Sequence, residues 1–144
     1  FNLKYDNKIF DIIWAEGAIF IIGFERGLKE WKRLLKPDGV IVVSELSWTT
    51  NDIPKEISEF WADEYPGMQS VEGNIKTAHQ CGYNVKNHFT ILESAWFDDY
   101  YTPMENRINE LKEKYKENIE AQRELNKEMI EINMYKKIFI LLWL

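Results

Sequence analysis

The chain has 144 residues, the length of a single domain, and 45% of them are hydrophobic, which excludes a disordered region. Cys81 is the only cysteine, which excludes an internal disulfide and favours a reducing, cytoplasmic location, and no apolar run reaches the roughly 18 residues of a membrane span. The net charge of −6 arises within residues 1–103, and without a basic stripe it argues against nucleic acid and anionic membrane surfaces as partners.

The first predicted element is a strand over residues 9–15, buried on both faces, because β-branched and aromatic residues follow one another almost without interruption. A helix is predicted next, since the following apolar residues fall on one helical stripe: Phe24, Leu28, Trp31 and Leu35. The sequence Pro37-Asp38-Gly39 is expected to end this helix and turn the chain into a second buried strand at 40–46. The three elements predict a βαβ unit with parallel strands and a right-handed crossover.

The middle of the chain alternates predicted helices with polar connections. Residues 47–52 are a predicted loop, and helices are expected at 54–61 and at 71–81, the second of them ended by Gly82. Residues 83–91 alternate apolar with polar side chains, which is typical of a half-exposed strand near the edge of a sheet.

The last third of the chain is predicted to be mainly helical. An aromatic and acidic loop at 96–101 precedes a helical stretch at 104–137, in which a phase slip near Asn118 indicates two helices. The segment 138–144 is apolar throughout, so we expect it to be a buried strand, antiparallel and inserted between the two strands that precede it.

Glu16, Gly17 and Ala18 directly follow the first predicted strand, where open α/β sheets bind their ligands. The Glu16 carboxylate could accept hydrogen bonds from a ligand or act as a base, and Gly17 would let a ligand approach the backbone. The alternative interpretation is a plain turn between strand and loop.

Glu45 ends the second predicted strand in the same layer and is soon followed by Trp48. Two carboxylates at adjacent strand ends could face each other across a pocket, or Glu45 could simply be hydrated at its rim.

Two further groups of residues are candidate sites. His79, Cys81 and His88 have no fourth ligand at a usual interval, and the spacing of the first two directs their side chains apart on a helix, so no metal site is predicted. The aromatic residues of 96–101, which lie next to two acids, could form a lid or a box for a cationic group. The alternative, favoured for most of them, is that they pack against the edge of the sheet.

The segment from Phe10 to Ala18, the helix that ends in Leu35-Lys-Pro-Asp-Gly39 and the strand that leads to Glu45 resemble the second half of a class I S-adenosylmethionine-dependent methyltransferase. The downstream pattern from Ala78 to Pro103 is similar to a branch that methylates small molecules. The resemblance covers essentially the whole chain. The chain has no counterpart of the family's Gly-rich cofactor loop, nor of the acidic residue that binds the ribose. It therefore resembles the C-terminal half of such a methyltransferase, either truncated or encoded by a split gene.

The resemblance implies an α/β Rossmann-like fold with a partial mixed sheet of strands 4-5-7-6, forming one domain over 1–144 with a helical insertion at about 102–137. It implies S-adenosylmethionine as cofactor, contacted by Glu16, Gly17 and Ala18, with Glu16 a candidate base. It places four residues near a small-molecule substrate: Glu45, Trp48, Trp96 and Tyr100. Methyl transfer depends mainly on in-line positioning, so a base is optional.

Two hypotheses follow for function. The first is an enzyme fragment that belongs to a methyltransferase, itself inactive and weak in cofactor binding. The second is a non-catalytic α/β association module. In both, the strand at 9–15 lacks the neighbour that it would have in a complete sheet, so we expect a homodimer, or pairing with a missing N-terminal half, through that strand.

Overall fold

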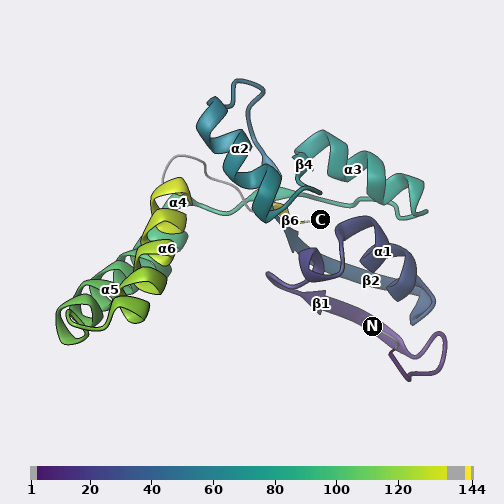
Figure 1. Ribbon diagram of the computed structural model, residues 1–144. Coiled ribbons are helices and arrows are strands. Elements are labelled where there is room, and N and C mark those ends of the chain that lie inside the picture. The colour runs from purple at the N-terminus through teal and green to yellow at the C-terminus, as the bar shows by residue number, and fades with distance from the viewer. Residues whose placement is uncertain (1–2, 136–141, 144) are drawn as a thin grey trace. The chain divides into compact units, whose positions relative to one another are not determined.

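The computed structural model describes residues 3–135 and 142–143, and it divides into two compact units that are treated separately (Figure 1). The sheet unit comprises Phe1–Thr90 and Ile140–Leu144, and the helical unit comprises Ile91–Phe139. The sheet unit contains β1 (Phe10–Ala15), η1 (Ile19–Ile21), α1 (Phe24–Lys32), β2 (Leu35–Glu45), β3 (Ser47–Trp48), α2 (Lys55–Glu64), β4 (Gln69–Ser70), α3 (Val71–Gln80), β5 (Phe89–Thr90) and β6 (Leu142–Trp143). The helical unit contains α4 (Glu93–Trp96), the π-helix η2 (Phe97–Tyr101), α5 (Thr102–Lys114) and α6 (Ile119–Tyr135).

The main sheet has the strand order β1-β2-β6-β5. β1 and β2 are parallel, and β6 is antiparallel to both β2 and β5. These pairings agree with the βαβ unit and with the inserted, antiparallel final strand expected from the sequence, of which only residues 142–143 belong to the described part. A second, two-stranded sheet pairs β3 with β4 in parallel.

The core of the sheet unit lies between the strands and the helices α1 and α3. It is formed by buried residues from all of these elements and from the short helix η1: Ile19, Phe24, Leu28, Val43, Ala78 and Cys81. Gly27 lets α1 approach η1, because a Cβ at this position would lie 2.6 Å from Cγ1 of the fully buried Ile19. This packing fixes the helix layer over β1 and β2 and so positions the ends of these strands.

The structure corrects two predictions about the βαβ unit. β1 is not buried on both faces, since Ile12 and Trp14 are 57% and 61% exposed. Ile13 and Ala15, which alternate with them, are partly buried, so the helix layer covers one face of β1 and the other face is exposed. Pro37-Asp38-Gly39 does not precede the second strand but lies within β2, where the pairing with β1 shifts register.

The predicted helices of the sheet unit are confirmed as α2 and α3, and Gly82 ends α3 with a φ of +80°. The predicted loop at 47–52 begins instead with the short strand β3, because Ser47 and Trp48 find partners on β4. The predicted strand at 83–91 is reduced to the two residues of β5, the part that pairs with β6.

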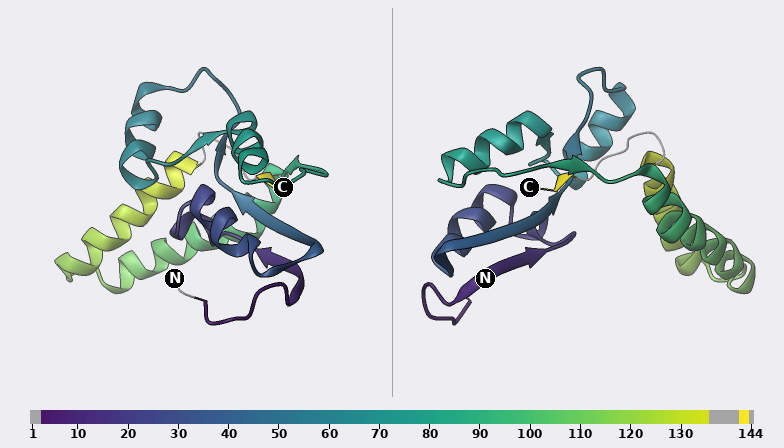
Figure 2. Two further views of the ribbon diagram at one scale, coloured as in Figure 1. Left: turned by 90° about the vertical axis from the view of Figure 1, so that its right-hand side faces the viewer. Right: turned by 180° about the vertical axis from the view of Figure 1, so that it is seen from behind.

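The helical unit confirms two helices with a break near Asn118, and the loop predicted at 96–101 is wrong. That segment continues from α4 into η2, because its aromatic side chains pack on one another and on the following helices. Figure 2 shows α5 and α6 as an antiparallel pair. Their buried contacts come from Ile108 and Ile132.

Candidate functional site

The carboxyl ends of β1 and β2 lie side by side, as the sequence predicts for parallel neighbours. Ala15 pairs with Val43, and the next turn of chain is tied down by the Gly17 N–H, which donates a 2.7 Å hydrogen bond to the Ser44 hydroxyl. Gly17 has a φ of +53°, a conformation that favours glycine. No heavy atom would lie within 4 Å of a Cβ built there, so the space next to this turn is open.

Glu16, Gly17 and Ala18 are all exposed at this turn. The Glu16 carboxylate therefore faces solvent at the end of β1, where a ligand could reach it. Ser44, one residue before the end of β2, is buried and holds the turn in place. The geometry is that of a fixed backbone turn with an accessible carboxylate, the arrangement that α/β proteins use at ligand sites.

Glu45 is placed differently, since only 1% of its surface is exposed, and the interpretation of a hydrated rim residue is wrong. Its Oε1 accepts a hydrogen bond from the Tyr65 hydroxyl, and its Oε2 is buried and has no hydrogen-bond partner in the described part of the chain. Burial raises the pKa of Glu45 to about 7, and the bond from Tyr65 opposes this shift. The carboxyl can therefore exchange a proton near neutral pH.

Tyr65 closes over this carboxyl from the end of α2. Its ring contacts Phe20 edge to face at 6.0 Å, and its own pKa is raised by burial and by the neighbouring Glu45. The phenol therefore stays protonated and remains a donor to Glu45.

A second buried polar contact continues from β2 toward α3. The Asn74 amide donates a 2.9 Å hydrogen bond to the Ser47 hydroxyl, which in turn donates to the Glu45 backbone carbonyl at 3.2 Å. Asn74 is 1% exposed, and its Oδ1 has no hydrogen-bond partner among the described residues. Two buried acceptor oxygens, one on Glu45 and one on Asn74, are thus available at the carboxyl end of β2 for a hydrogen-bond donor.

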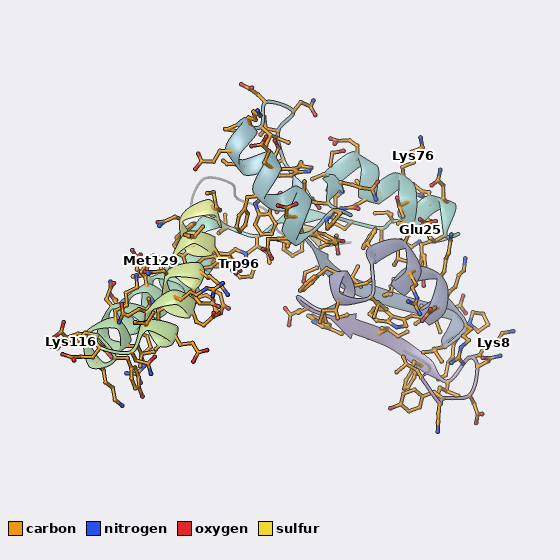
Figure 3. The ribbon with its side chains drawn as sticks, viewed as in Figure 1. Lys8, Glu25, Lys76, Trp96, Lys116 and Met129 are labelled. Carbon is orange, nitrogen blue, oxygen red and sulfur yellow. The ribbon has the colours of Figure 1, made fainter. Side chains whose placement is uncertain are left out.

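The remaining predicted site residues lie in two places. Trp48 is half-buried on β3, in register with Ser70. Trp96 and Tyr100 belong to the helical unit, where their rings contact edge to face at 5.7 Å, and Trp96 packs with Met129 against the helical core (Figure 3). The sheet unit therefore brings together Glu16, Gly17, Ala18 and Glu45.

Sequence reasoning missed the residues that surround Glu45: Ser44, Ser47, Tyr65 and Asn74. A signal for two of them was present. Ser44 interrupts a strand that is otherwise apolar, and Asn74 shares the buried stripe of α3 with Ala78, so each was a polar residue in a buried position. Tyr65 ends α2 and carried no such pattern.

Within the described residues, no group of three or more His, Cys, Asp or Glu side chains is arranged to hold a metal ion. In the same part of the chain, no helix is both long and apolar enough to cross a membrane.

No protein-family model matches the sequence. No curated protein matches it either.

Solved structures do match, over almost the whole of this chain. One match is phosphoethanolamine N-methyltransferase 2 of Haemonchus contortus, in complex with phosphomonomethylethanolamine and S-adenosylhomocysteine. It is 16% identical with a TM-score of 0.69, and the match covers 97% of this chain and 33% of that protein. An S-adenosylmethionine-dependent methyltransferase of Thiobacillus denitrificans, bound to S-adenosylhomocysteine, is 18% identical with a TM-score of 0.71, over 96% and 57%. The (4+2) cyclase SpnF is 14% identical with a TM-score of 0.69, over 99% and 50%.

These similarities establish the fold. The chain has the α/β, Rossmann-like fold of class I S-adenosylmethionine-dependent methyltransferases, as the sequence resemblance implied. It spans between one third and somewhat more than half of the length of these three proteins. One of the three is a cyclase by its description, so the fold by itself does not define the reaction.

Proposed function

We propose that this chain forms part of an enzyme that transfers a methyl group from S-adenosylmethionine to a small-molecule acceptor. The observation that carries the proposal is the tied turn at the end of β1, where the Gly17–Ser44 hydrogen bond holds an exposed Glu16 beside the buried Glu45. In this fold, ligands bind at the carboxyl ends of the strands.

The side chains at this edge suit such a cofactor. S-adenosylmethionine carries a positive sulfonium and a positive ammonium group, and this edge of the sheet offers the exposed Glu16 carboxylate. When bound, the cofactor supplies an electrophilic methyl group. Glu16 would accept the proton from an acceptor that must lose one, and the turn of Gly17 and Ala18 would hold the cofactor beside it.

We assign the turn of Glu16, Gly17 and Ala18 to the cofactor, with Glu16 the candidate base for an acceptor that must lose a proton. Glu45 and Trp48 are assigned to the acceptor side, with Tyr65 covering Glu45. Trp96 and Tyr100, which belong to the helical unit, stay predictions that rest on the sequence resemblance alone.

The test follows backbone amide signals of the whole chain by nuclear magnetic resonance during titration with S-adenosylhomocysteine. We expect weak binding, with shifts at Gly17 and Ala18, and no such shifts with ATP, which has an adenosine but no thioether-linked amino acid. Shifts that spare this turn, or that ATP reproduces there, would contradict the assignment. A micromolar dissociation constant in calorimetry would contradict the expectation that this chain alone binds weakly.

A non-catalytic association module is the second candidate, and the edge position of β1 favours it. In the described residues no strand covers the outer edge of β1, and Ile12 and Val40 are 57% and 46% exposed. Such an edge pairs readily with another strand. We propose that it pairs with β1 of a second copy across a two-fold axis.

Light scattering at high micromolar concentration tests this pairing, and we expect a dimer. Replacing Ile12 with lysine should return the mass of the monomer, since a charge on an edge strand opposes pairing, whereas Lys76→Glu on α3 should leave the dimer intact. A monomer in the unmodified chain would exclude pairing through β1.

A further inference from the structure

Two buried oxygen atoms at the carboxyl end of β2 lack the hydrogen-bond donors that buried acceptors normally have. They are Oε2 of Glu45 and Oδ1 of Asn74, and neither has a partner in the described part of the chain. Both residues are 1% exposed, so bulk water does not solvate these atoms. A buried acceptor without a donor destabilises the fold, and an ionised carboxylate oxygen does so more strongly. The pair therefore indicates a site for a ligand that donates hydrogen bonds.

The two oxygens lie in one region, because α3 packs against the end of β2. Val43 and Ala78 belong to the same apolar core, and four residues earlier on α3 the Asn74 amide donates to the Ser47 hydroxyl at 2.9 Å. Residues four apart on a helix lie on the same face. Glu45 lies between Val43 and Ser47 along the chain, and the Ser47 hydroxyl also donates to its backbone carbonyl. Glu45 is thus enclosed between two contacts to one face of α3.

The hydroxyl groups beside these oxygens are already used as donors elsewhere. The Tyr65 hydroxyl donates to Oε1, the other oxygen of the Glu45 carboxyl, and the Ser47 hydroxyl donates to a backbone carbonyl. Each hydroxyl has one proton, so neither can also donate to Oε2 of Glu45 or to Oδ1 of Asn74.

The missing donor has a definable chemistry. It must supply two protons for hydrogen bonds, one to each oxygen, and a positive charge is favoured beside an ionised carboxylate. A primary or secondary ammonium group meets both conditions. A hydroxyl group has one proton and no charge, and a quaternary ammonium group has no proton to donate.

We propose that the small-molecule acceptor carries a primary or secondary ammonium group, which binds between Oε2 of Glu45 and Oδ1 of Asn74. This inference rests on the proposed function, in which Glu45 belongs to the acceptor side. The carboxylate attracts the charge, and the amide oxygen fixes the direction of a second N–H group. Tyr65 covers the carboxyl, and its ring contacts Phe20, which is 39% exposed, so the ligand enters from this side by displacing Tyr65.

Ethylammonium chloride serves as the probe, titrated into the whole isotope-labelled chain and followed by nuclear magnetic resonance. At about pH 8 the Glu45 carboxyl, with a pKa of about 7, is mostly ionised, and the probe keeps its charge. We expect saturable shifts of the Asn74 side-chain amide and of the Ser47 backbone amide. Three control solutes should not produce them: sodium chloride, tetramethylammonium chloride, which has no N–H donor, and ethanol, which has no charge.

Two pairs of variants locate the probe. Glu45→Gln removes the charge and Asn74→Ala removes the second acceptor, so each should weaken probe binding about tenfold. The matched controls Glu72→Gln and Asn84→Ala, both at exposed positions, should bind the probe as the unmodified chain does. No saturable shifts, equal shifts with tetramethylammonium or ethanol, or equal binding within a pair would overturn the proposal. None of these outcomes bears on the turn at Gly17, whose response to S-adenosylhomocysteine is measured without the amine.

Discussion

Replacing Glu45 with glutamine should stabilise the chain increasingly as the pH rises above 4.5, with the full gain at neutral and higher pH. Burial raises the pKa of this carboxyl from 4.5 to about 7 in the folded chain. Between these two values the folded state keeps a proton that the unfolded state has lost. The free energy of unfolding therefore falls as the pH rises through this window. Below and above the window, the contribution of Glu45 to this free energy does not change with pH.

The magnitude follows from the width of the window. A difference of about 2.5 pH units at about 1.36 kcal/mol for each unit gives roughly 3 kcal/mol. Glutamine keeps an oxygen that can accept the hydrogen bond from Tyr65 and is neutral at every pH, so it mimics the protonated carboxyl. Above pH 7 the Glu45→Gln variant should thus be more stable by about 3 kcal/mol, and below pH 4.5 the two should be equal.

Urea unfolding of both chains between about pH 4 and pH 8 measures this difference. Tyr65→Phe serves as the companion variant, because loss of its hydrogen bond removes what lowers the pKa of Glu45 and should move the upper limit of the window to higher pH. Parallel stability curves for the unmodified chain and Glu45→Gln would refute the reasoning, since they would mean that Glu45 titrates alike in both states.

Three further substitutions test the packing and the helix ends by urea unfolding. Gly27→Ala should destabilise the chain by about 1–3 kcal/mol, because the new Cβ would lie 2.6 Å from Ile19 Cγ1, and an unchanged stability would refute this tight packing. Lys32→Met should cost about 1 kcal/mol, since its ammonium donates to the Cys81 and Gly82 carbonyls at 2.8 Å each. Lys29→Met, which breaks one exposed ion pair with Glu25, should leave the stability nearly unchanged. Ser70→Ala should cost about 1 kcal/mol, because the hydroxyl caps α3 by accepting from the Gly73 N–H. An equal cost for Ser58→Ala, whose half-buried hydroxyl only donates to the Lys55 carbonyl, would count against this cap.

The βαβ unit was predictable because its signals are local. Apolar runs, the helical stripe from Phe24 and the glycine after α3 each reflect the conformational preference of a few adjacent residues. These local signals, together with the motif that ends at Gly39 and resembles the methyltransferase family, were enough to infer the fold. The helix break near Asn118 was predictable for the same reason.

The errors share a cause, which is that burial and pairing depend on neighbours distant in sequence. An apolar run such as β1 predicts burial on both faces whether or not a second layer covers it, and here the face of Ile12 and Trp14 is exposed. The alternation at 83–91 is a real strand pattern, but in the described residues only Phe89 and Thr90 pair with β6.

The candidate site was predicted at the correct strand ends but with the wrong environment for one carboxylate. Position in the sequence placed Glu16 and Glu45 at neighbouring ends, and nothing local revealed that Tyr65, twenty residues away, closes over Glu45. Long-range packing decides which of two adjacent carboxylates is hydrated and which is buried.

The buried carboxyl also bears on the choice between an enzyme and an association module. Domains of this size are stable by only about 5–15 kcal/mol, so a group that costs about 3 kcal/mol at neutral pH removes a substantial share. Buried carboxyls with a raised pKa are common at functional sites, and association through β1 does not need one. A stabilised Glu45→Gln chain that still dimerises would separate the two roles, because it would show that the carboxyl serves neither stability nor pairing.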